Sequence, residues 1–159
     1  MTAASVENTD NFLVKYAADG SMAWARSLKG SKLDDINAMD VANHQVVIGG
    51  VIRSEDLAVD NAPGILMKTL DTTGTWNSML IISFDTDGNY QWNYIAGSSN
   101  QPTDVKTIAI EKDGSIWNAG TTFGTYYFNP DAEDEAKQFP SKAKGGQDMY
   151  LMKLSSKGE

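Results

Sequence analysis

The sequence predicts an all-β protein built from a repeated unit of four short antiparallel strands. An Asp-Gly turn followed by a tryptophan occurs twice, as "YAADGSMAW" at 16–24 and as "FDTDGNYQW" at 84–92. Apolar residues alternate with other residues in the segments before these turns, which is the period of a strand. No segment shows the 3.6-residue period of an amphipathic helix. We therefore expect about two complete four-stranded units and the first strand of a third.

The repeat has a period of roughly 70 residues, which is read from pairs of matching positions. The Asp-Gly pairs at 19–20 and 87–88 have the same separation in the sequence as Trp24 and Trp92. A third beginning follows as "DMYLMKLSSKGE" at 148–159. Self-similarity at a fixed period is typical of proteins that stack one supersecondary unit on the next.

Each unit is expected to hold four strands. The ranges are 12–17, 22–28, 36–42 and 45–52 in the first unit, and 79–84, 90–95, 105–110 and 115–121 in the second. An Asp-Gly pair between two strands predicts a type I′ hairpin turn, which needs positive φ at both central residues. Gly50 and Gly120, which are one repeat apart, end the apolar run of the fourth strand in each unit. A further short strand is expected within 65–69.

These units divide the chain into five segments, and each complete repeat is expected to form one sheet. The segments are a first repeat at 10–53, a connection at 54–78, a second repeat at 79–121, a connection at 122–148 and the start of a third repeat at 149–159. The first strand of each repeat is apolar on one face and partly apolar on the other, which suits a sheet between two neighbouring sheets. Connections of this length often carry function, so a binding surface is expected there.

The composition excludes several classes of function. The 159 residues carry 13 basic and 21 acidic side chains, so the formal charge is 13 − 21 = −8. An acidic surface repels phosphate backbones, which argues against nucleic acid as a partner. Without cysteine there are no disulfides, zinc-thiolate sites or catalytic thiols. No apolar run approaches the ~20 residues of a membrane-spanning helix, and the first residues lack the pattern of a signal peptide.

The repeat resembles a known family, the bacterial β-propeller repeat of the SBBP type. The first copy carries the pattern as "DNFLVKYAADGSMAWARSLKG", "DDINAMDV" and "VVIGG". The second carries it as "SMLIISFDTDGNYQWNYIAG", "DVKTIAI" and "IWNAGTT", and the third begins as "DMYLMKLSSKG". The resemblance covers roughly residues 10–159. Ala17 replaces the Asp found at Asp85, and Ser83 replaces the Lys, so a ligand site repeated in every unit is not expected.

The resemblance implies that each four-stranded unit is a propeller blade in a surface or secreted protein of Bacteroidetes-type bacteria. Under it, Trp24 and Trp92 fill the wedge between blades, and Gly20 and Gly88 shape the turns, so all four are structural residues. Two blades and one strand do not close a ring of four to eight. We favour a fragment whose missing blades belong to a longer chain. Self-association that completes the ring and an open sandwich of two sheets stay as alternatives.

The residues give no catalytic set, no cofactor site and no strong metal site. His44 is the single histidine, and its place in "NHQ" favours a solvated turn residue. Asp34 and Asp35, with Asp104 in the second copy, stand before the third strand and are interpreted as turn-capping residues. Calcium is considered for one acidic cluster, for which a solvated loop is the favoured interpretation. That cluster comprises Asp131, Glu133, Asp134 and Glu135.

We therefore expect a non-catalytic scaffold that binds a protein or a glycan through its loops. The candidate contact residues are Trp76, Tyr126 and Tyr127, which are expected to be exposed aromatic side chains of the connections. They could stack on sugar rings, although the favoured interpretation is that they cover the edge of a blade. The alternative is a fragment of a propeller enzyme, either a glycan-active hydrolase or a quinoprotein-like protein, with its catalytic residues outside this chain. Near-matches to the sequence motifs of both enzyme classes fail in spacing, at 69–76 and at 85–92.

Overall fold

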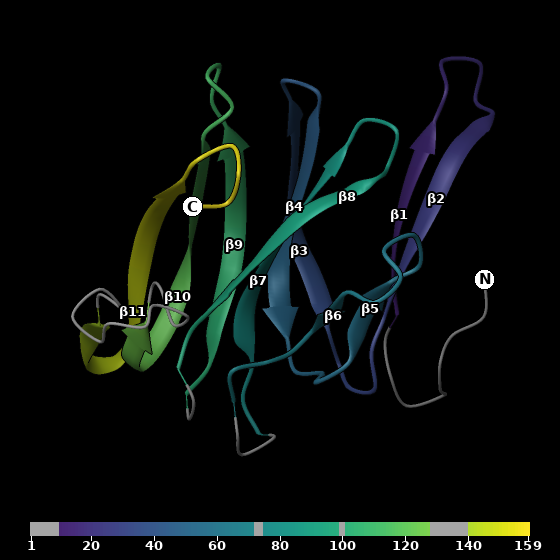
Figure 1. The fold of residues 1–159 in the computed structure, drawn as a ribbon. Coiled ribbons are helices and arrows are strands. Elements are labelled where there is room, and N and C mark those ends of the chain that lie inside the picture. The colour runs from purple at the N-terminus through teal and green to yellow at the C-terminus, as the bar shows by residue number, and fades with distance from the viewer. Residues whose placement is uncertain (1–9, 72–74, 99–100, 128–139) are drawn as a thin grey trace.

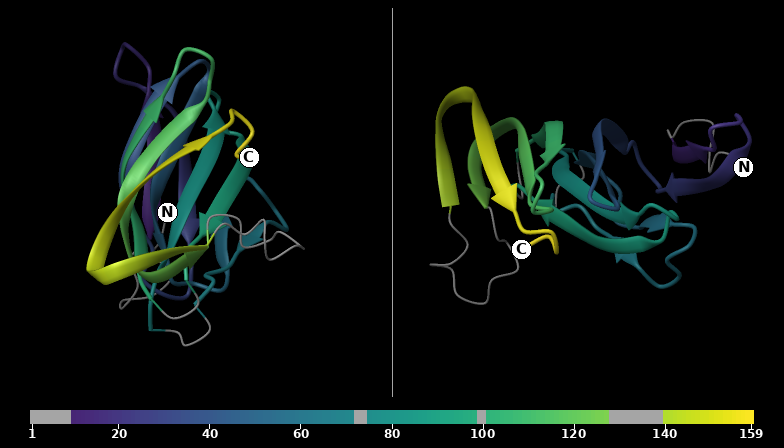
Figure 2. Two further views of the ribbon diagram at one scale, coloured as in Figure 1. Left: turned by 90° about the vertical axis from the view of Figure 1, so that its left-hand side faces the viewer. Right: turned by 90° about the horizontal axis from the view of Figure 1, so that it is seen from above.

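Three antiparallel sheets make up the described part of the protein, which confirms the expected all-β class. The computed structural model describes residues 10–71, 75–98, 101–127 and 140–159, and every element in these ranges is a strand (Figure 1). These residues accordingly contain no helix that is long and apolar enough to cross a membrane. Seen from above, the sheets follow one another from the N-terminal end of the molecule to the C-terminal end (Figure 2).

Most strands lie close to the ranges expected from the sequence. The first sheet has the order β1-β2-β5-β6, with β1 at Asn11–Tyr16, β2 at Met22–Lys29, β5 at Leu57–Val59 and β6 at Leu66–Met67. The middle sheet has the order β3-β4-β7-β8, with β3 at Asp35–Ala42, β4 at Gln45–Ile52, β7 at Ser78–Asp85 and β8 at Tyr90–Ala96. The last sheet has the order β11-β10-β9, with β9 at Thr103–Ile110, β10 at Ile116–Tyr127 and β11 at Pro140–Leu154. However, β10 and β11 extend into the connection expected at 122–148, and β5 lies in the connection expected at 54–78.

The expectation that the four strands of one repeat form one sheet is wrong. The repeat at 10–53 contributes β1 and β2 to the first sheet, and β3 and β4 to the middle sheet. The middle sheet is completed by β7 and β8 from the repeat at 79–121, because β4 pairs with β7 along its whole length. Nearly all of β4 is buried, so it needs a partner on each side and a neighbouring sheet on each face.

The chain crosses between the first two sheets at Gly30–Asp34, and the buried Asp34 fixes the crossing. Its carboxylate accepts hydrogen bonds from the backbone N–H of Arg53 at 2.8 Å, and from the backbone N–H and hydroxyl of Ser54 at 3.0 and 2.6 Å. These bonds tie the segment before β3 to the residues after β4. Asp34 therefore attaches the segment between β2 and β3 to the residues that follow β4. Held there, this segment does not form the turn of a hairpin between β2 and β3.

Two apolar cores lie between the three sheets. The core between the first and middle sheets joins Leu28 to Leu80, Ile82 and Phe84 of β7. The core between the middle and last sheets joins β7 to β9, β10 and β11. Its main members are Val47, Met79, Ile81, Val105, Ile116, Tyr126, Tyr150 and Leu154. Alternate residues of β7 therefore serve opposite cores, so the middle sheet is covered on both faces as its apolar pattern predicts.

The Asp-Gly turns are not type I′. Positive φ occurs at Gly20, Gly88 and Gly114, with values of 84°, 79° and 84°, and the aspartate before each glycine is not among the residues with positive φ. Each turn instead closes with two backbone bonds, in the first case Gly20 N–H to Ala17 O and Ala17 N–H to Ser21 O. This is the three-residue hairpin loop in which one glycine takes the left-handed conformation. Positive φ at two successive residues occurs at Asn43 and His44, where the sequence lacks Asp-Gly.

Gly50 and Gly120 are required by the approach of a neighbouring backbone. A Cβ at Gly50 would collide with the carbonyl oxygen of Asp35, and one at Gly120 would collide with that of Asp104. Both glycines lie where the pairing of the third and fourth strands of a repeat changes register. A bulge brings one backbone against the other at such a point, which leaves room for glycine alone.

Candidate functional site

A tryptophan from one sheet lies on the turn of the next sheet. The indole N–H of Trp24, in β2, donates a 3.1 Å hydrogen bond to the carbonyl oxygen of Thr86, in the turn after β7. A Cβ at Gly88 would lie 2.8 Å from Cδ2 of Trp24, so the ring covers the side of the turn that carries no side chain. We call this pairing the Trp–turn contact. It joins the first sheet to the middle sheet through residues that lie almost one repeat apart in the sequence.

The same contact recurs between the middle and last sheets. Trp92, in β8, donates to the carbonyl oxygen of Ser156 at 3.1 Å, and a Cβ at Gly158 would lie 2.6 Å from Cε3 of Trp92. Both predicted structural tryptophans thus lie between sheets, each on the turn of the following repeat. The sequence signal that could have paired them is the separation between tryptophan and glycine, which is nearly the same in the two contacts.

Charged side chains reinforce the first contact. Arg26 donates from Nε to the carbonyl oxygen of Gly88 at 2.6 Å, and its guanidinium lies 5.4 Å from the centre of the Trp24 ring. Lys15 donates to the same Thr86 oxygen as Trp24, at 2.7 Å. The turn therefore presents backbone carbonyls to donors from the preceding sheet, a chemistry that suits an indole or a cation.

Aspartates hold the turns in shape. Asp19 accepts hydrogen bonds from the hydroxyl and the backbone N–H of Ser21 at 2.7 and 2.9 Å, and these bonds lower the pKa of Asp19. Asp113 makes the corresponding bonds to Ser115, which lower its pKa in the same way. The carboxylate of Asp85 accepts hydrogen bonds from the backbone N–H of Asp87 and from the backbone N–H and side-chain amide of Asn89. These carboxylates are therefore occupied within their own turns.

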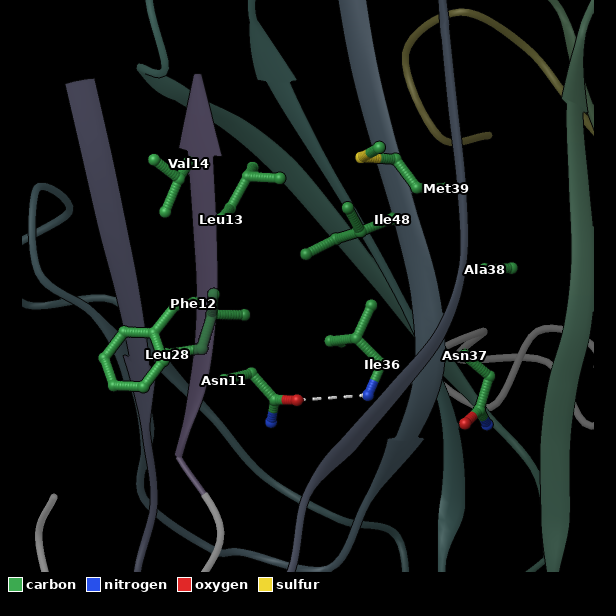
Figure 3. A pocket seen from close by; sticks show the side chains of 10 residues that line it. All are labelled: Asn11, Phe12, Leu13, Val14, Leu28, Ile36, Asn37, Ala38, Met39 and Ile48. Atoms are coloured by element: carbon green, nitrogen blue, oxygen red, sulfur yellow. Dashed lines mark hydrogen bonds between the residues drawn. The ribbon is translucent and has the colours of Figure 1, made fainter. Parts of the chain in front are cut away.

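An apolar groove of about 420 Å³ lies between β1 and β3. Leu13, Ile36 and Ile48 point into it from the two sheets, whereas the ring of Phe12 points to the other side of β1 (Figure 3). Asn11 closes one end, because its Oδ1 accepts from the backbone N–H of Ile36 at 3.3 Å (Figure 3). The remaining lining residues are Val14, Leu28, Asn37, Ala38 and Met39. None of the described residues that line this groove is an acid, a base or a nucleophile, so the groove supplies contacts and no catalytic group.

The three aromatic candidates for sugar or protein contact lie in different surroundings. Trp76 is exposed at 38%, and its backbone N–H donates to the buried carboxylate of Asp71 at 2.7 Å. The expectation that Tyr126 is exposed is wrong, since it is fully buried and stacks on Tyr150 with ring centres 5.6 Å apart. Burial raises the pKa of Tyr126 far above its ordinary value. Tyr127 is half-buried, so Trp76 stays the one accessible candidate of the three.

His44 and the aspartates before the third strands are not brought together. His44 is exposed in the turn between β3 and β4. Asp104 accepts from the backbone N–H and hydroxyl of Thr121 at 3.1 and 2.7 Å, and its carboxylate pairs with Lys106 at 2.7 Å. Asp34 is bonded to the segment after β4. These carboxylates hold strand ends.

No group of three or more His, Cys, Asp or Glu side chains that could hold a metal occurs within residues 10–71, 75–98, 101–127 and 140–159. The acidic cluster at 131–135, the candidate for calcium, lies outside the described residues. Among known proteins, no family model matches the chain, and no curated protein is significantly similar to it.

Proposed function

We propose that the chain is a non-catalytic β-propeller repeat module of a bacterial surface or secreted protein, with each sheet corresponding to one blade. The observation that carries the proposal is the Trp–turn contact, formed once between the first and middle sheets and again between the middle and last sheets. A contact that recurs with the sequence repeat lets units be added in series, each held by its neighbours. The tryptophans and turn glycines that recur from unit to unit are thus assigned a structural role.

The surfaces between these contacts are proposed to bind a protein or a glycan. Among the described residues of the connections, Trp76 is the accessible aromatic candidate, and its backbone N–H and that of Thr75 both donate to Asp71. An exposed indole is suited to stacking on a sugar ring or on an apolar side chain of a partner. The groove between β1 and β3 offers apolar contacts and no titratable group. Both features favour binding over chemistry.

The proposal is tested by binding and turnover assays on the same preparation. The full chain is applied to glycan and bacterial-protein arrays, and its activity on a panel of chromogenic glycosides is measured in parallel. We expect binding that Trp76→Ala removes, while Ile65→Ala, which truncates another side chain of the same connection that is also exposed at 38%, leaves it unchanged. Turnover of any glycoside by the purified chain would contradict the non-catalytic assignment. Binding that survives Trp76→Ala would exclude the Trp76 loop as the contact surface.

A further inference from the structure

The turn after β1 has the shape of the two turns that carry tryptophans, yet it carries none. Gly20, Gly88 and Gly158 follow the first strand of each repeat, with φ of 84°, 79° and 82° and equivalent backbone hydrogen bonds. Gly88 is buried under Trp24, and Gly158 is half-buried under Trp92. Gly20 is exposed, and no described residue comes within 4 Å of the place where its Cβ would stand.

The hydrogen-bond acceptor of the Trp–turn contact is also present at this turn. In the two occupied turns the indole N–H meets the carbonyl two residues before the glycine, at Thr86 and Ser156. Ala18 stands two residues before Gly20 and is exposed. The same backbone path therefore presents the Ala18 carbonyl oxygen beside a bare glycine surface, as in the occupied turns.

The face of β1 beside this turn repeats a face that is buried elsewhere. Leu80, Ile82 and Phe84 in β7 are fully buried in the core between the first and middle sheets, where Leu28 and Leu13 pack against them. The equivalent residues of β1 are Phe12, Val14 and Tyr16, which are exposed at 50%, 37% and 64%. An apolar surface with the pattern of a buried sheet face thus adjoins the uncovered turn.

We infer that the turn at 17–21 and this face of β1 bind a β-hairpin of another repeat of the same type, whose tryptophan lies on Gly20 and donates its indole N–H to the Ala18 carbonyl oxygen. The inference rests on the proposed function as a repeat module, and it names the partner that the module takes at this end. Leucines in the hairpin, at the places of Leu13 and Leu28, would cover Phe12, Val14 and Tyr16.

The indole decides which occupant fits. A second copy of this chain presents Met149 and Leu151 of β11 as exposed apolar side chains, which match the type of face that covers β7. Its two tryptophans at the required strand position, Trp24 and Trp92, already lie on turns of their own chain. A second copy therefore offers an apolar face but no tryptophan that is free to lie on Gly20. A further repeat of the same type offers both.

The test adds one repeat to the full chain. Residues 11–78 are duplicated ahead of Asn11, which places the added tryptophan as far before Gly20 as Trp24 lies before Gly88. We expect an NMR cross-peak between the added indole and the Gly20 α-protons. We also expect Gly20→Asn to lower the urea midpoint of the extended chain as much as Gly88→Asn does, while leaving that of the 159-residue chain unchanged. Asparagine tolerates positive φ, so it fills the indole position without breaking the turn.

A matched control is Gly64→Asn in the original copy, because Gly64 has a φ of 86° and no described residue within 4 Å of its Cβ position. This variant should leave the midpoint of both chains unchanged. The inference is overturned if the added indole shows no cross-peak with Gly20 while the original Trp24 keeps its contact with Gly88. Association of the unextended chain that Gly20→Asn disperses would overturn the choice of occupant in favour of a second copy. Loss of the Trp24–Gly88 cross-peak in the unextended chain would instead contradict the proposed function.

Discussion

Trp24 and Gly88 are in contact although they belong to different repeats, and a Cβ on Gly88 would lie 2.8 Å from the indole ring. The contact has a polar half as well, because the indole N–H donates to Thr86 O. A half-buried tryptophan usually finds a partner for its N–H, and here the partner is a backbone carbonyl of the next sheet. The packing on Gly88 sets the distance between the two sheets, and the directional hydrogen bond also fixes how one sheet is aligned with the next.

Replacing Trp24 with phenylalanine should separate the two halves of the contact. Trp24→Phe keeps an aromatic ring on Gly88 but loses the hydrogen bond to Thr86, and we expect the free energy of unfolding to fall by about 1 kcal/mol. Trp24→Ala should lower it by about 2 kcal/mol, because the apolar contact is lost too and the site is half-buried. Urea denaturation measures both. Trp76→Phe is the control, and a loss equal to that of Trp24→Phe would contradict this account.

Gly50→Ala should be among the most damaging single-methyl substitutions in the chain. Its Cβ would collide with the backbone carbonyl of Asp35, which cannot rotate away as a side chain could. We expect the free energy of unfolding to fall by about 3 kcal/mol, at the upper end of the cost of overpacking. Gly146→Ala, where a Cβ meets nothing described within 4 Å, serves as the control in the same urea titration. A Gly50→Ala chain as stable as the wild type would show that the bulge is misplaced.

His44→Gly should stabilise the protein. His44 has a φ of 62° in the turn between β3 and β4, a left-handed conformation that costs roughly 1 kcal/mol or more for a residue with a Cβ. Asn43, at 50°, tolerates this conformation better, and Asn followed by Gly is the favoured pair for such a turn. We expect a gain of about 1 kcal/mol in the free energy of unfolding, measured by urea denaturation. A loss of stability would mean that the imidazole makes a contact that outweighs the strain.

The pKa of Asp113 should report on its turn. The hydroxyl of Ser115 and then its backbone N–H hold this pKa below the ordinary value of 3.8. A depressed folded-state pKa contributes stability that is present above the unfolded value and is lost as pH falls through the folded value. The protein should therefore lose stability on acidification below pH 3.8.

NMR titration checks this by residue. In Ser115→Ala the pKa of Asp113 should rise toward 3.8, while that of Asp19, which is held by Ser21, should not change. If the Asp113 pKa stays low in this variant, the hydroxyl is not its main cause.

Most of the strand positions can be predicted from the sequence because alternation of apolar residues is a local property, whereas the extensions of β10 and β11 cannot. Sheet membership cannot, since the pattern of β2 and β3 is equally consistent with a hairpin between them. The deciding fact is that β4 is buried almost throughout and therefore takes β7 as its second neighbour. The turn type escapes prediction for a related reason. Asp-Gly is compatible with two hairpin loops, and the backbone bonds of 17–21 select the longer one.

The residues of the Trp–turn contact can be predicted from the sequence, but which tryptophan contacts which glycine cannot. Trp24 and Gly88 both stand out because they recur, yet the sequence pattern places each in its own repeat. The indole of Trp24 in the first repeat meets the turn of the second because the middle sheet combines halves of two repeats. Tyr126 comes after the apolar run that ends at Gly120, so the sequence places it in a surface connection, and this prediction is wrong. The strand β10 instead continues through it to Tyr127 and carries the Tyr126 ring into the core.

The most direct test of the account is a double-mutant cycle between Trp24 and Gly88. Gly88→Asn places a side chain where the ring lies and should cost about 2 kcal/mol, and Trp24→Ala should remove most of that added cost. The account predicts a coupling free energy of more than about 1 kcal/mol for this pair. It predicts none for Trp24 with Gly20, although Gly20 is much closer to it in the sequence. Additive effects at Trp24 and Gly88 would contradict the claim that these sheets are held together by a tryptophan on a turn.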